Sequence, residues 1–220
     1  CVGSSNAYTG LREDYRKQLK RAHEELGFKY VRFHGLLDDR MSTLIMKKTY
    51  TGEELGLVYN FVNIDNIFDW LLDHGMKPFI ELGFMPTAIA KSDRTVFHYK
   101  GNISPPKAYE QWEELIKRLV EHLIERYGLE EVRTWFFEVW NEPNLFFFFD
   151  GDQNEYFKLY ESTARTIKKI DNKLKVGGPA TSCNAWIKDT VEYCADNNVP
   201  LDFISTHHYP TDDPLWTSGL

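Results

Sequence analysis

The fold of this chain is decided by residues 135–144, which read WFFEVWNEPN. The aromatic and β-branched residues up to Trp140 are typical of a buried β-strand. Pro143 has no N–H to donate to a neighbouring strand, so the strand must end before it. Glu142 therefore lies where a buried strand passes into a loop. In sheets and barrels of parallel strands, ligands bind at this carboxyl end.

Strands and helices alternate on both sides of this stretch. Apolar residues at helical spacing predict helices, and short apolar runs that end at Gly or Pro predict strands. The expected strands cover residues 1–4, 30–35, 77–84, 135–140, 174–179 and 201–209, and the expected helices cover about 11–26, 64–74, 105–127, 153–170 and 185–196. Repeated units of this kind imply parallel strands joined by right-handed crossovers. No internal repeat or low-complexity linker interrupts the pattern, so we expect one domain.

Two α/β architectures fit this order, the doubly wound open sheet and the (β/α)8 TIM barrel. An open sheet usually holds a phosphate on a glycine-rich turn, and neither G-x-G-x-x-G nor G-x-x-x-x-G-K occurs. The residues at the strand ends are instead polar or aromatic: His34, Phe84, Asn141, Glu142, His207 and Tyr209. A ring of such strand ends is typical of the barrel. Six strands and five helices leave two of its eight units missing. We therefore interpret residues 1–220 as strands 1 to 6 of a partial catalytic barrel from a longer protein, with no second domain.

The composition excludes several classes of partner. The chain of 220 residues has a net charge of −7 and no cluster of Lys or Arg, which argues against a nucleic-acid partner. No apolar run approaches the roughly 18 residues of a membrane span. The cysteines Cys1, Cys183 and Cys194 show no metal-ligand spacing, so we expect no metal and no cofactor. Reduced thiols slightly favour a cytoplasmic location, but secretion stays open because the chain begins without Met.

Glu142 is the leading candidate for chemistry. A carboxyl group in an aromatic-lined strand mouth loses hydration, which favours its protonated form and suits it to act as an acid. Cleavage of a glycosidic bond needs such an acid and a second carboxylate. The alternative role is a Glu that only caps the next turn. Trp140 and Asn141 before it, with Pro143 and Asn144 after it, favour the catalytic role.

Several motifs together resemble one known family. They are WNEPN at 140–144, FHGLL at 33–37, PFIELGFMP at 78–86, GNISPP at 101–106 and VGGP at 176–179. The first is similar to the fourth-strand signature of the retaining clan A glycoside hydrolases, which are (β/α)8 barrels. In order and over essentially the whole chain, the set resembles glycoside hydrolase family 39. Within that family it is closer to the bacterial β-xylosidases than to the α-L-iduronidases.

The resemblance implies a role for each strand-end residue. Glu142 matches the general acid/base of a double-displacement mechanism, and Asn141 matches the amide that binds the sugar 2-hydroxyl. His34 matches a histidine that lines the pocket of the glycone, the sugar whose bond is cleaved. His207 and Tyr209 match sixth-strand residues that face the same pocket. Phe84 is expected to add an aromatic wall. The implied substrate is a xylo-oligosaccharide or a related β-glycoside.

The resemblance also implies a nucleophile that we do not find. In the family it is a Glu at the end of the seventh strand, and by our count the chain stops after the sixth. Asp212 and Asp213 lie in a loop and cannot replace it. A barrel without its last units exposes strand edges. We therefore expect the 220 residues alone to be oligomeric or unstable, and inactive on aryl xylosides.

Neighbouring residues carry further expectations. His207 shares a strand face with Tyr209, so we prefer it over His208 as the ligand. Glu81 is expected in a polar layer inside the barrel, and Glu138 is expected to be buried and paired, for example with Arg32.

Three questions stay open from the sequence. The run of phenylalanines at 146–149 fits either an aglycone wall, against the group that leaves the sugar, or an oligomer contact. An endo-acting β-glycanase or a hydrolase for another glycone fits the same motifs. A non-catalytic carbohydrate-binding or assembly fragment is the alternative outside the enzymes.

Overall fold

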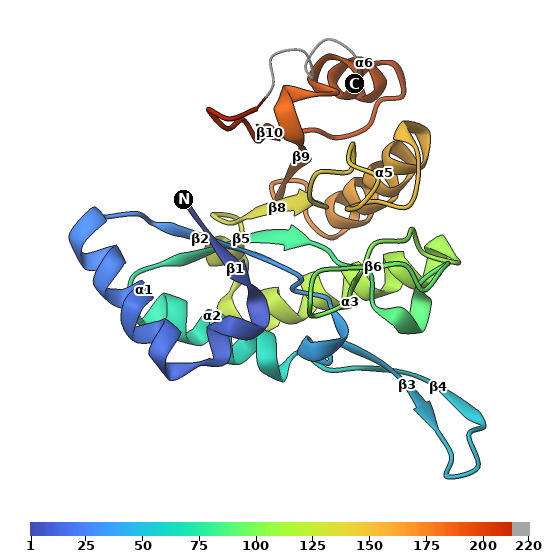
Figure 1. The fold of residues 1–220 in the computed structure, drawn as a ribbon, viewed down its shortest axis with the longest axis horizontal. Coiled ribbons are helices and arrows are strands. Elements are labelled where there is room, and N and C mark those ends of the chain that lie inside the picture. Colours follow the sequence, from blue (N-terminus) through green and yellow to red (C-terminus); the bar gives the residue numbers. More distant parts are fainter. Residues whose placement is uncertain (213–220) are drawn as a thin grey trace.

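The computed structural model describes residues 1–212 and contains one main sheet of six parallel strands. The spatial order of the strands follows the chain: β1 (Val2–Asn6), β2 (Tyr30–His34), β5 (Lys77–Leu82), β8 (Phe136–Val139), β9 (Lys175–Thr181) and β10 (Phe203–Thr206). Figure 1 shows the sheet curling from β1 to β10. Each strand thus pairs with the next along the chain, as in the wall of a barrel.

Helices connect the strands and follow one another along the outside of this curl (Figure 1). They are α1 (Glu13–Leu26), α2 (Val62–Asp73), α3 (Tyr109–Tyr127), the single turn α4 (Leu129–Val132), α5 (Gln153–Ile170) and α6 (Ile187–Asp196). Asp152 caps α5 by accepting a hydrogen bond from the Glu155 N–H at 2.8 Å. This cap begins α5 soon after the loop that carries Glu142. None of the helices within residues 1–212 is long and apolar enough to cross a membrane.

The predicted strands and long helices are confirmed with shifts at their ends, and three elements differ. The helix expected from about residue 105 begins at Tyr109, because the backbone before it, including Ala108, is extended. The single turn α4 was not predicted, so the described residues hold six helices rather than five. The expected loop after residue 35 contains a hairpin of β3 (Leu44–Lys48) and β4 (Glu54–Tyr59).

The hairpin escaped prediction because it has no consistently buried face. Most of its side chains are exposed or half-buried, with Leu44 the buried exception. Its sequence therefore lacks the alternation of apolar and polar residues that marks a strand on a core. Figure 1 shows it extending away from the rest of the molecule.

Candidate active site

A cleft of about 720 Å³ lies at the carboxyl ends of the strands. Its lining comes from five of the six main strands or the residues just after them, as the barrel architecture requires. The polar and aromatic side chains that line it are Ser4, Ser5, Arg32, His34, Phe79, Glu138, Asn141, Glu142, Phe148, Ser205, Thr206, His207 and Tyr209. Five of the six strand-end residues expected from the sequence are therefore gathered in one place.

The backbone around Glu142 is held by the two neighbouring strands. The Trp140 N–H donates to the Leu82 carbonyl at 3.3 Å, and the Glu142 N–H donates to the Ala180 carbonyl at 2.9 Å. All three non-glycine residues Trp140, Glu142 and Ala180 have positive φ, at 72°, 46° and 51°. Such conformations cost on the order of 1–3 kcal/mol each and cluster at functional sites. The strain turns Glu142 toward the cleft, where the residue is 9% exposed.

The loop after Glu142 is tied down at two points. The Asn144 amide donates to the Ser182 carbonyl at 3.2 Å and accepts from the Ser182 N–H at 2.9 Å. The Trp140 indole N–H donates to the Phe148 carbonyl at 2.8 Å. These bonds fix the backbone on both sides of the carboxylate, so its position is set before a ligand arrives.

His207 contacts Glu142 directly. Its Nδ1 lies 2.8 Å from the Glu142 Oε1, and its backbone N–H donates to the Thr181 carbonyl at 2.8 Å. The neighbouring His208 is largely exposed, with its Nδ1 3.6 Å from Asp212. The strand thus presents His207, rather than His208, to the candidate acid, as the side-chain alternation predicted.

Arg32 connects the polar residues at the floor of the cleft. Its Nε donates to Glu138 at 2.5 Å, and its Nη2 lies 2.9 Å from Glu81. Burial lowers the pKa of Arg32, but the charges of Glu81 and Glu138 outweigh it and hold the pKa above its usual value. The expected pairing of Glu138 with Arg32 and the interior position of Glu81 are both confirmed.

The same guanidinium orients Asn141. Arg32 Nη2 donates to the Asn141 Oδ1 at 3.1 Å, so the amide oxygen is occupied on the protein side. Within residues 1–212, no hydrogen bond is found from the Asn141 Nδ2. The residue lines the cleft, and its amino group is therefore the part that a ligand can use as a donor.

His34 is held by Glu81. Its Nδ1 lies 2.7 Å from the Glu81 Oε2, and the chain turns sharply after it at Gly35, where φ is 65°. A Cβ at Gly35 would lie 2.6 Å from Asp38, so only glycine fits there. The charge of Glu81 raises the pKa of His34. Burial would raise the pKa of Glu81, but His34 and Arg32 outweigh it and lower that pKa.

Phe84 does not line the cleft, which corrects the expectation of an aromatic wall there. Its side chain has no exposed surface, and its ring packs 5.9 Å from Trp140 and 6.5 Å from His34. The aromatic residue on the cleft surface is instead Phe148, which also contacts Phe97 at 5.4 Å. Phe148 lies in a loop, and only its place in the run of phenylalanines pointed to it.

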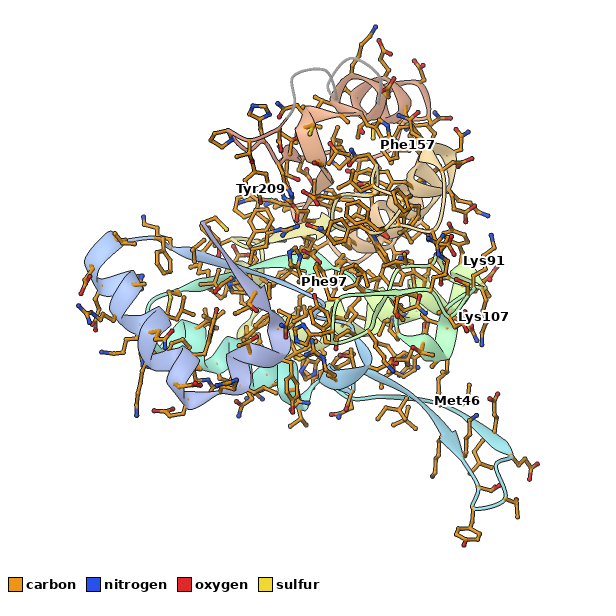
Figure 2. The ribbon with its side chains drawn as sticks, in the orientation of Figure 1. Met46, Lys91, Phe97, Lys107, Phe157 and Tyr209 are labelled. Carbon is orange, nitrogen blue, oxygen red and sulfur yellow. The ribbon has the colours of Figure 1, made fainter. Side chains whose placement is uncertain are left out.

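Tyr209 lies at the mouth of the cleft. Its side chain is 57% exposed, and its backbone N–H donates to Asp212 at 2.7 Å. Figure 2 shows Tyr209 beside the last strand and Phe97 nearer the centre of the molecule. The sequence did not place Arg32 or Ser205 on the cleft surface, although both lie on strand faces that point into it.

The cleft holds one available carboxylate among the described residues. Glu138 and Glu142 are the only acidic residues of residues 1–212 that line it, and Glu138 is paired with Arg32. No group of three or more His, Cys, Asp and Glu in this part of the chain could hold a metal ion. The arrangement can therefore donate and accept a proton at Glu142.

Comparisons with known proteins agree with this geometry. The family model for glycosyl hydrolases family 39 matches residues 1–218. A β-xylosidase of Caldicellulosiruptor saccharolyticus is 58% identical over 220 residues, which are 100% of this chain and 44% of that protein. A β-xylosidase of Geobacillus stearothermophilus is 49% identical over 217 residues, which are 97% of this chain and 43% of that protein.

A solved structure shows the same fold. The crystal structure of a monomeric β-xylosidase from Caulobacter crescentus aligns with a TM-score of 0.89 at 48% identity, covering 96% of this chain and 42% of that one. The chain thus spans less than half the length of these relatives. The predicted TIM-barrel class is confirmed, with six of its strands described. The chain belongs to glycosyl hydrolase family 39.

Proposed function

We propose that this chain forms the acid/base half of a retaining glycoside hydrolase that cleaves β-xylosidic bonds in xylo-oligosaccharides. The observation that carries the proposal is the position of Glu142 at the strand mouth, fixed by His207 and next to the oriented amide of Asn141. The relatives named β-xylosidases support the substrate class.

In the proposed first step, Glu142 donates its proton to the glycosidic oxygen while a second carboxylate attacks the anomeric carbon. The bond to the leaving group breaks, and a covalent glycosyl-enzyme forms. In the second step, the ionised Glu142 takes a proton from water, and that water displaces the carboxylate. The Asn141 Nδ2 donates to the sugar 2-hydroxyl in both steps. We place the nucleophile outside this chain, because Glu138 is paired with Arg32.

The charge of the cleft favours a neutral sugar. Arg32 is the only Arg or Lys of residues 1–212 that lines the cleft, and it is paired with Glu81 and Glu138. A uronate would need a cation that is free to bind its carboxylate. Xylose carries no charge, so it needs no such group.

The test replaces Glu142 with Gln in the full-length polypeptide. Gln keeps the shape of the side chain but cannot donate an acid proton. Turnover of alkyl xylosides, whose leaving groups need protonation, should fall far more than turnover of 2,4-dinitrophenyl xyloside, whose leaving group does not. Glu121→Gln, on an exposed position of α3, is the matched control. An equal loss on both substrates, or no loss, would contradict the acid role.

A further inference from the structure

The run of phenylalanines after the acid/base candidate passes gradually from the core to solvent. Phe149 is buried, Phe148 lines the cleft, Phe147 is 41% exposed and Phe146 is 76% exposed. Exposed rings next to each other are costly in water unless a ligand or partner covers them. The run thus has a reason to be exposed that the fold alone does not supply.

The rings form a continuous path from the floor of the cleft to its rim. His34 stacks on Phe97 at 6.2 Å, and Phe97 contacts Phe148 at 5.4 Å. Phe148 contacts Phe147 at 4.8 Å, and Phe147 contacts Phe146 at 5.2 Å. The exposed rings are therefore an extension of the cleft surface and not a separate patch.

The segment that carries the rings is held in place. The Phe149 ring packs 5.4 Å from Trp140, and the Phe148 N–H donates to the Leu145 carbonyl at 2.8 Å. The following Asp150 accepts an ion pair from Arg94, and its N–H donates to the Ile103 carbonyl at 2.8 Å. A surface fixed in this way loses little conformational entropy when it binds a ligand.

The position of the path relative to Glu142 assigns the part of the substrate that it meets. The acid donates its proton to the oxygen that carries the leaving group, so the leaving group must lie beside Glu142. Phe148 lines the same cleft six residues further along the chain. The path of rings therefore starts on the leaving-group side.

The chemistry of the path favours an apolar group. The rings offer no hydrogen bond to hydroxyl groups. The cation beside them, Arg94, is paired with Asp150 and lies 3.4 Å from the Phe146 carbonyl. A sugar in this place would lose hydration without gaining hydrogen bonds, whereas an aromatic ring would gain contact area.

We propose that Phe146, Phe147 and Phe148 form a leaving-group platform that selects β-glycosides with an aromatic aglycone. The proposal rests on the proposed function of the same site. It also decides between the two roles that the sequence left open for this run, an aglycone wall and an oligomer contact.

The test compares benzyl and methyl β-xylosides, whose leaving alcohols have nearly equal acidity and differ in the aromatic ring. In the full-length enzyme, the double variant Phe146→Ser, Phe147→Ser should lower the benzyl-to-methyl ratio of kcat/KM roughly tenfold. Turnover of methyl xyloside should stay unchanged. Tyr50→Ser, which removes an exposed ring at the end of the distant hairpin, is the matched control and should leave the ratio unchanged.

Binding of the uncleaved benzyl and methyl 1-thio-β-xylosides, measured by calorimetry, separates this proposal from the proposed function. An absence of turnover in the unaltered enzyme would contradict the glycosidase activity alone. An affinity ratio that is the same in the double variant and the unaltered enzyme would overturn the platform. A change in oligomeric mass with unchanged ratios would also overturn it and assign the rings to an oligomer contact.

Discussion

The Nδ1 of His207 lies 2.8 Å from the Oε1 of Glu142, although 65 residues separate them in the chain. The contact joins the end of β10 to the loop after β8, across the intervening strand β9. It holds the carboxyl group in one orientation relative to the cleft. A general acid works only when its proton points at the leaving oxygen, so the contact bears directly on catalysis.

Replacing His207 with Ala should therefore impair protonation of the leaving group. Because small misplacements of a catalytic group are costly, we expect kcat/KM on alkyl xylosides to fall roughly tenfold to a hundredfold. Activity on 2,4-dinitrophenyl xyloside should fall much less. His208→Ala is the control, since that side chain is largely exposed and points away from Glu142. An equal effect of the two substitutions would contradict the positioning role.

Replacing Asn141 with Ala should remove a donor that acts most strongly in the transition state. Loss of one such donor costs about 10²–10³ in kcat. The loss should be much smaller on a 2-deoxy xyloside, which has no 2-hydroxyl to bind. Steady-state kinetics of both enzymes on both substrates form a double-mutant cycle. Additive effects would show that Asn141 does not bind that hydroxyl.

Replacing Arg32 with Leu should destabilise the fold, because it leaves Glu81 and Glu138 buried without their cation. We expect a loss of about 3–5 kcal/mol in the free energy of unfolding, measured with urea. Adding Glu81→Gln and Glu138→Gln should restore part of it. Arg12→Leu, which breaks an exposed ion pair with Asp14, should change stability little. Equal losses for both arginines would contradict the account.

The pair of His34 and Glu81 should make stability depend on pH. The charge of Glu81 raises the pKa of His34 above 6.5, so the contribution of the charged histidine is complete below that pH. It should be lost as the pH rises through the folded-state pKa. His34→Gln removes this titration. The difference in unfolding free energy between parent and variant should therefore shrink from pH 6 to pH 9, and a constant difference would contradict the pairing.

Much of this arrangement was predictable from the sequence, because the decisive residues follow strands with strong patterns. Glu142 and Asn141 follow a buried aromatic run, and the pairing of Glu138 with Arg32 followed from their strand faces. The contact between His207 and Glu142 was not predictable. It depends on the angle at which two loops leave the sheet, and strand periodicity carries no information about that angle.

Phe84 shows the limit of the same reasoning. It ends a strand as the other site residues do, yet its ring turns into the core against Trp140. Phe148 lies in a loop without any periodicity, and it lines the cleft instead. The β3–β4 hairpin was missed for a related reason, since its strands mostly lack contact with the core. Position along a strand predicts which residues approach a site, and loop geometry decides which of them reach it.

The most direct test of the central claim, that Glu142 is the acid/base of a retaining enzyme, is azide rescue of Glu142→Ala in the full-length polypeptide. On 2,4-dinitrophenyl β-xyloside, the variant should form the glycosyl-enzyme but hydrolyse it slowly, since no base activates water. Azide needs no base, so it should restore turnover and yield β-xylosyl azide, with retained configuration, as identified by NMR. Turnover equal to that of the unaltered enzyme without azide, or an α-configured azide product, would contradict the claim.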